Sequence, residues 1–156
     1  MVQGQSCHDD GLRLVQNSDK ALSQADYEAL ATLRYTLRRF MDFSTSAAQS
    51  AGVPPQQHQA LLAIKGHPGG APMTIGMLAE RLMIVPHAAT ELVGRLVEAG
   101  YVARQIDPGD RRRQVLHLTE KSEEVLVRLS AIHLREIREL APDLIEILGR
   151  LQKDVG

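Results

Sequence analysis

The hydrophobic periodicity of this chain changes at Gly100, and that change constrains the fold more than any other feature. Before this glycine, apolar residues recur every three or four positions, which is the spacing of amphipathic helices. After it, Tyr101–Ile106 and Gln114–Leu118 alternate between apolar and polar residues, as strands do. The segment Asp107–Arg113 between them is rich in turn formers and charge. We therefore predict a mostly α-helical fold with a small β-hairpin whose connecting segment, Asp107–Arg113, is a charged tip.

Two long amphipathic stretches flank the centre of the chain. The first begins after Ser23, a good cap residue, and runs to about Ser50. The second begins after Thr119 and is expected to break or kink at Pro142, which leaves a final helix at Leu144–Leu151. The apolar stripes of such helices are longer than a small domain can cover, so a second copy of the chain is their expected cover.

Three shorter helices are predicted between these stretches. One is opened by Pro54-Pro55, one is capped by Thr74, and one has Pro86 at its first position and ends at Gly100. The short segment Met83–Val85 separates the last two helices, so they form a helix-turn-helix. With the hairpin, these are the parts of a winged helix-turn-helix, whose second helix fits the major groove of DNA while the hairpin lies on the backbone or in the minor groove.

Composition and charge exclude several classes of protein. The 156 residues carry a formal net charge of −1, so a polycation that binds nucleic acid through its overall field is excluded. The longest apolar run, Ala60–Ile64, is far too short to cross a membrane. A single cysteine and the absence of an export signal predict a cytoplasmic protein. Positive charge is local to the hairpin, where the segment Arg104–Arg113 holds four arginines against two aspartates.

Two sets of motifs connect this arrangement with a known family. The first set, around the hairpin, is quite specific, and the second, on the two helices, is shared by many helix-turn-helix proteins. The motifs are Gly100-Tyr101-Val102, Asp107-Pro108-Gly109-Asp110-Arg111-Arg112, Leu118-Thr119, Leu78-Ala79-Glu80-Arg81-Leu82 and Leu92-Val93-Gly94-Arg95-Leu96. With them, the chain resembles the MarR family of winged helix-turn-helix transcriptional regulators from about Gln56 to Leu118. It departs from the family at Met83, where glycine is common, and at Val85, where serine is frequent.

The resemblance implies a homodimer that binds a pseudo-palindromic operator in double-stranded DNA, most often as a repressor. It also implies that the first helix and the last two helices interlock between chains, and that a small lipophilic or phenolic ligand, or an oxidant, releases the DNA. The expected division is a mobile N-terminal arm at 1–22, an N-terminal dimerisation helix at 23–52, a winged helix-turn-helix domain at 53–118 and C-terminal dimerisation helices at 119–156.

The expected DNA contacts lie on the helix that starts at Pro86, here called the reading helix, and on the hairpin, here called the wing. Glu91 accepts a hydrogen bond from cytosine N4 but repels phosphate, so sequence choice is expected to depend on DNA shape and on the wing. Asp110, by analogy with the family, orients an arginine at the wing tip. The expected DNA-binding residues are Thr74, Pro86, His87, Ala88, Thr90, Glu91, Arg95, Asp110, Arg111, Arg112 and Arg113.

Other residues allow more than one interpretation. Tyr35, Phe40 and Phe43 either line a ligand pocket or pack the core and the dimer, and packing is the expected use. Cys7 lies beside acidic residues, which favours an incidental cysteine over an oxidant sensor. A winged-helix dimer that acts as a protein adaptor is the alternative to a regulator, and Glu91 and the near-neutral charge keep it open.

Neither a metal site nor an enzyme is predicted. The six histidines lack the spacing of metal ligands, so no cofactor is expected. No activated nucleophile, carboxylate pair or phosphate-binding loop stands out. The chain is therefore expected to bind its partners rather than to transform them.

Overall fold

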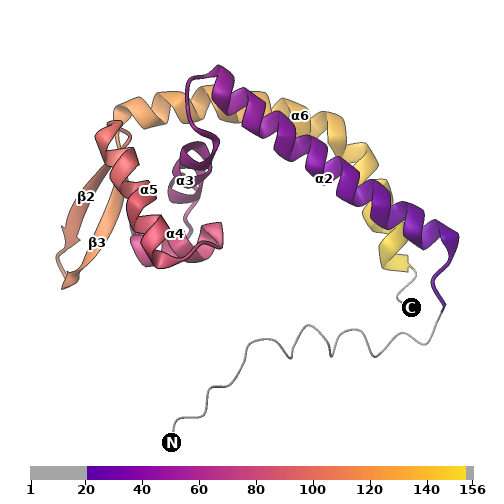
Figure 1. Ribbon diagram of the computed structural model, residues 1–156, viewed down its shortest axis with the longest axis horizontal. Helices are drawn as coiled ribbons and strands as arrows, with labels where there is room; N and C mark the ends of the chain where they lie inside the picture. Colours follow the sequence, from indigo (N-terminus) through magenta and orange to yellow (C-terminus); the bar gives the residue numbers. More distant parts are fainter. Residues whose placement is uncertain (1–20, 154–156) are drawn as a thin grey trace, which may run out of the picture.

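The computed structural model describes residues 21–153, which form an elongated molecule with two long helices and a smaller unit below one end of them (Figure 1). The predicted arm at 1–22 and Cys7 fall outside the described residues, apart from Ala21 and Leu22. The long helices are α2, Gln24–Ser50, and α6, Glu120–Lys153. The smaller unit comprises α3 (Pro55–Lys65), β1 (Met73–Thr74), α4 (Ile75–Leu82), α5 (Pro86–Glu98), β2 (Val102–Asp107) and β3 (Asp110–Leu118). The predicted fold class, mostly helical with a small antiparallel sheet, is confirmed.

Local signals set the start of α2 and the turn that follows it. The Ser23 hydroxyl accepts a hydrogen bond from the Asp26 backbone N–H at 3.2 Å, and the Asp26 carboxylate accepts one from the Ser23 backbone N–H at 2.6 Å. This reciprocal capping box satisfies two N–H groups that the first turn of a helix leaves unpaired. After Ser50 the chain turns at Gly52, whose φ of +75° favours glycine, and buries Val53 before α3 begins.

The sheet contains a strand that the sequence analysis did not predict. β1 pairs antiparallel with β3, Met73 opposite Leu116 and Thr74 opposite Val115, so the sheet order is β1-β3-β2. A strand of two residues is too short to show an alternating pattern. Its effect is to attach the start of α4 to the wing.

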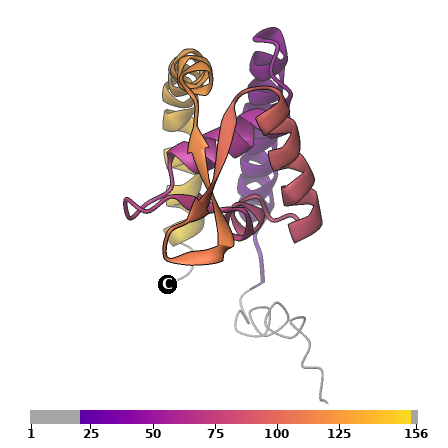
Figure 2. The same cartoon turned by 90° about the vertical axis from the view of Figure 1, so that its left-hand side faces the viewer.

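The wing tip is shorter than predicted. Asp107 pairs with Asp110, so the turn consists of Pro108 and Gly109 and the arginines that follow belong to β3. The Gly109 backbone N–H donates to the Asp107 carboxylate at 2.8 Å, which stabilises the turn. The prediction of a seven-residue connection was wrong because both faces of this part of the hairpin are exposed, so its strands need no apolar alternation. Figure 2 shows the hairpin facing the viewer, with α5 next to it.

The predicted break at Pro142 was also wrong. α6 is one helix with Pro142 inside it, and no separate helix begins at Leu144. A proline within a helix costs about 3 kcal/mol through a lost hydrogen bond and a steric clash. Leu140 and Ile147 are buried on the two sides of the proline, and this burial offsets the cost. The helix curves instead of breaking (Figure 1).

The core of the smaller unit is aliphatic and includes part of α6. Leu61, Leu78, Leu92 and Leu96 are less than 3% exposed, and Leu129 of α6 packs in the same cluster. The long helix is therefore fixed to the winged unit by shared core packing. Among residues 21–153, no helix is long and apolar enough to span a membrane.

Candidate nucleic-acid interface

The turn between α4 and α5 forms without the glycine that such turns favour. Met83 ends α4 with φ 54° and ψ 43°, a left-handed conformation, and its side chain is 92% exposed. The Ile84 backbone N–H donates to the Ala79 carbonyl at 3.0 Å and closes the turn. Val85 then caps α5 in an extended conformation, without a side-chain hydrogen bond. A left-handed residue other than glycine costs about 1–2 kcal/mol, so this turn stores strain.

The reading helix, α5, is amphipathic as predicted. Ala89, Leu92, Val93 and Leu96 are buried against the core. The expected contact residues Pro86, His87, Thr90, Glu91 and Arg95 are exposed, and Ala88 is half-buried. α5 therefore presents one continuous outward face.

The polar side chains at the start of this face already have partners within the helix. The Thr90 hydroxyl donates to the Pro86 carbonyl at 3.1 Å. His87 Nε2 lies 3.5 Å from a carboxylate oxygen of Glu91, one turn further along. These contacts orient the three side chains before any ligand is bound.

Asp110 organises the wing. Its carboxylate accepts a hydrogen bond from the Arg112 backbone N–H at 3.0 Å and lies 3.8 Å from Nε of Arg113. The arginine side chain that it contacts is thus that of Arg113. Within residues 21–153, no carboxylate forms an ion pair with Arg111 or Arg112.

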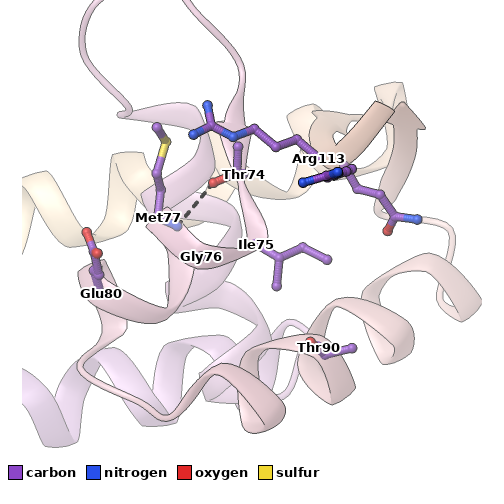
Figure 3. A pocket seen from close by; sticks show the side chains of 9 residues that line it. Thr74, Ile75, Gly76, Met77, Glu80, Thr90 and Arg113 are labelled. Carbon is purple, nitrogen blue, oxygen red and sulfur yellow. Dashed lines mark hydrogen bonds between the residues drawn. The ribbon is translucent and has the colours of Figure 1, made fainter. Parts of the chain in front are cut away.

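A hollow of about 690 Å³ gathers residues from α4, α5 and β3. Four of the predicted DNA-binding residues, Thr74, Thr90, Arg112 and Arg113, line it. Figure 3 shows Thr90 on α5 across from Thr74 and Arg113, with Ile75 between them. The other lining residues were not predicted from the sequence; they are Ile75, Gly76, Met77, Glu80 and Gln114.

A further cation reaches the reading helix from the wing. Nη2 of Arg104, on β2, lies 3.5 Å from the position that a Cβ of Gly94 would occupy. Arg104 was predicted to add to the positive charge of the wing but was not among the expected DNA-binding residues. A glycine inside a helix indicates a close approach by another group, and Gly94 was the signal that could have found this contact.

The three aromatic residues considered for a ligand pocket do not form one group. Phe40 and Phe43 lie edge-on to His133, with ring centroids 6.2 and 5.9 Å away. Tyr35 is 60% exposed and lies beside Arg39, whose guanidinium carbon is 5.9 Å from the ring centroid. The two phenylalanines therefore pack inside the chain, while Tyr35 faces outward.

Two buried histidines join the winged unit to the long helices, and neither was expected. His58 of α3 stacks on His133 of α6 with ring centroids 5.0 Å apart. His133 contacts the Leu129 carbonyl through Nδ1 and the Ser44 hydroxyl through Nε2, while Nε2 of His58 is buried without a hydrogen-bond partner. Burial lowers the pKa of His58, and the neighbouring His133 lowers it further. In residues 21–153, no three potential metal ligands come together.

Comparison with known protein families matches the same helix-turn-helix and wing that the structure shows. The model of the MarR family matches residues 51–113, which contain the whole helix-turn-helix and most of the wing. Residues 51–113 belong to the MarR family. The MarR resemblance inferred from the motifs is thereby confirmed.

Relatives of this chain are described as transcriptional regulators. The HTH-type transcriptional regulator YcgE of Bacillus subtilis (strain 168) is 35% identical over 94 residues, which are 60% of this chain and 59% of that protein. A putative transcriptional regulatory protein for the hcr operon of Thauera aromatica is 29% identical over 119 residues, or 72% and 69% of the two chains. The alignments with YcgE and with YkoM, also of B. subtilis, span 59% and 58% of those proteins.

Solved MarR-family structures share the fold over most of the chain. AbsC of Streptomyces coelicolor has a TM-score of 0.68 at 22% identity, covering 87% of this chain and 93% of its own. Sco3205 of the same organism, solved in complex with DNA, has a TM-score of 0.66 at 23% identity, covering 89% and 90%. The likeness includes the long helices, which the family model does not cover.

Proposed function

We propose that the protein is a cytoplasmic, homodimeric transcriptional regulator that binds a pseudo-palindromic operator in double-stranded DNA and acts as a repressor. The observation that carries this proposal is the convergence of Thr74, Thr90, Arg112 and Arg113 on one hollow beside the exposed face of α5. The structures of Sco3205 and of S. aureus MepR, both solved with DNA, support it by their common fold. In this arrangement α5 enters the major groove, and the wing follows the backbone into the minor groove.

The charge distribution supports contact with phosphate. The chain has a net charge of −1, yet Arg111 and Arg112 are exposed on β3 with no carboxylate partner within residues 21–153. Arginine and threonine side chains and helix N-termini are common phosphate contacts. A DNA phosphate at the hollow would meet Arg112 and Arg113 from one side and the start of α4 from the other.

The long helices support a dimer. Both expose large apolar side chains along their length, and a second copy of the chain would cover them. These side chains are Tyr27, Leu30, Tyr35, Leu37 and Met41 of α2, and Val127, Leu134, Ile137, Ile145 and Leu148 of α6. A dimer would present two reading helices, and two half-sites on one side of DNA are about 34–36 Å apart.

An apolar hollow of about 480 Å³ between α2 and α6 is the site that we propose for a small lipophilic or phenolic effector. Phe43, Ile132 and Arg128 are among its lining residues, so it offers apolar walls and one cation. Tyr35 and Phe40, the other aromatic candidates, do not line it. Occupation of this hollow would change the packing of α2 on α6, next to the winged unit.

Selection of bound sequences from a random pool of double-stranded DNA tests the central proposal. We expect enrichment of a site with two inverted half-sites and a steep loss of affinity as salt is raised, because each phosphate contact releases counterions. Failure to enrich any sequence, together with binding that does not depend on salt, would contradict the proposal.

One observation favours a second candidate, a protein-interaction adaptor. Met83 and Val85 form an exposed apolar turn, 92% and 66% exposed, next to the reading helix. Measurement of DNA binding at increasing salt concentration separates the two functions, because an adaptor does not bind DNA at any of these concentrations. Oxidant sensing through Cys7 stays a hypothesis, and an unchanged peroxide response in Cys7→Ser would remove it.

A further inference from the structure

The reading helix of this protein lacks the side chains that most often recognise guanine. Its first nine residues, Pro86–Gly94, contain neither lysine nor arginine, and Arg95 lies in its last turn. Arginine or lysine bonded to guanine O6 and N7 is the commonest base-specific contact in the major groove. The end of the helix that enters the groove first must therefore recognise bases in another way.

Apart from His87 and Glu91, which contact each other, the groups that this end exposes are largely apolar. The Val85 side chain is 66% exposed and makes no capping hydrogen bond. The ring of Pro86 is exposed next to it. The Thr90 hydroxyl is bonded to the Pro86 carbonyl, so its methyl group remains available for contact.

The anionic side chain near the start of this face, Glu91, restricts the choice of base pair. Glu91 is exposed and held 3.5 Å from His87. A carboxylate accepts hydrogen bonds, so it suits the amino groups of adenine N6 or cytosine N4 and is repelled by guanine O6 and N7 and by thymine O4. Between the two pairs that carry an amino donor, only A·T also offers a methyl group to the apolar side chains.

We propose that α5 selects A·T base pairs, with Val85, Pro86 and the Thr90 methyl group contacting the 5-methyl groups of thymine and Glu91 accepting a hydrogen bond from adenine N6. This proposal rests on the proposed function, DNA binding through α5, and adds the base identity to it. Each operator half-site then contains thymine under the start of α5, where a family member with a cationic reading helix would place guanine.

Replacing thymine by deoxyuridine in the selected operator tests the proposal directly. The replacement keeps the base pairing and removes only the 5-methyl group. We expect about four-fold weaker binding for each contacted thymine, the effect of losing one buried methyl group. Thymines outside the half-sites serve as controls and should show no change.

A protein variant identifies the partner of the methyl group. Val85→Ala should reduce the difference in affinity between the thymine and deoxyuridine operators, and the exposure of Val85 predicts that this variant folds. Val85→Thr, which keeps the shape of valine, provides a second variant and should retain most of the difference. Arg112→Ala, by contrast, should weaken binding to both operators by the same factor, because phosphate contacts carry no base identity.

The outcomes separate this inference from the function on which it rests. Equal affinity for all deoxyuridine operators, or selection of half-sites that require guanine under α5, would overturn the inference and leave DNA binding intact. If no sequence is selected at all, the proposed function fails and the inference fails with it. Loss of the thymine preference in Val85→Ala would support the inference that this side chain contacts the thymine methyl group.

Discussion

Single buried residues at the junction between α3 and α6 affect the stability of the folded chain. His58 is 3% exposed, stacks on His133 and has no hydrogen-bond partner for Nε2. The groups packed against the pair, Ser44, Phe40 and Phe43, carry no charge. A proton on His58 would therefore be buried without a counter-ion, which costs far more than an exposed charge.

The pH dependence of stability should reveal this histidine. Since the pKa of His58 lies below its ordinary value of 6.5 in the folded chain, the unfolded chain takes up the proton first as pH falls. The free energy of unfolding should be constant above that value, decrease as pH falls below it, and level off below the pKa of the folded chain. Urea unfolding at intervals between about pH 5 and pH 8 measures this window.

Variants assign the pH effect to His58. His58→Gln should flatten the decrease in unfolding free energy, although the variant itself can be less stable. His87→Gln, which changes a histidine whose side chain is 86% exposed, should keep the decrease. If His58→Gln retained the full decrease, another group would be responsible for it.

Arg112 should contribute to operator affinity without contributing to the dimer. Arg112→Ala removes one cation from the hollow, so we expect operator affinity to fall several-fold and the salt dependence to lose about one phosphate contact. Gel shift at several salt concentrations measures both effects. Arg150→Ala is the matched control, because Arg150 lies in the last turn of α6 and pairs with Glu146. Unchanged binding in Arg112→Ala would contradict the role of the wing.

At the scale of elements, predictability followed the strength of local signals. Ser23, Pro55, Thr74 and Pro86 marked the starts of their helices, because caps and N-terminal prolines act within one turn. β1 and the continuity of α6 were missed, because both depend on contacts distant in sequence. The strand exists by pairing with β3, and the helix continues past its proline by packing on both sides of it.

The residues of the candidate site were also predictable where local signals mark them, but their arrangement in space was not. Local signals placed Thr74 at the cap of α4, Thr90 on the reading helix and Arg112 and Arg113 in the wing. Their convergence on one hollow appears only in three dimensions. Arg104 of β2 approaches Gly94 of α5, and the glycine inside the helix was the local sign of this contact. The roles of these residues in DNA binding stay predictions.

The strained turn between α4 and α5 offers a test at this scale. Met83→Gly should raise the free energy of unfolding by about 0.5–1 kcal/mol, because glycine adopts a positive φ without a steric penalty. The 92% exposed methionine side chain loses no packing in the exchange. Met83→Ala keeps the strain and should give no gain, and denaturant midpoints compare the three proteins. A gain in the alanine variant would place the effect elsewhere.

At the scale of the whole molecule, the exposed apolar residues of α2 and α6 predict the assembly. Ile145 is 71% exposed on α6, and in a dimer it would be covered. Ile145→Asp should convert the dimer to monomer, because burial of an unpaired charge opposes association. Sedimentation velocity gives the oligomeric state.

The control for this variant adds the same charge elsewhere. Gln56 is exposed in the first turn of α3 and is not part of a long helix, so Gln56→Asp should leave the dimer intact. The monomeric variant should also bind the operator much more weakly, since a single reading helix contacts one half-site. A dimer that survives Ile145→Asp would require another interface.

Leu129 of α6 also packs in the core of the winged unit, so a movement of the long helix moves this unit with it. With 34 residues, α6 is about 51 Å long. If α6 tilts by about 4° about its C-terminal end, its N-terminal end moves by about 3.5 Å, which is close to the rise of one base pair along DNA. The winged unit is carried along, because it cannot slide on α6 without opening its own core. A small change in the angle between two copies of the chain would thus shift a winged unit by about one base pair relative to its half-site on the operator.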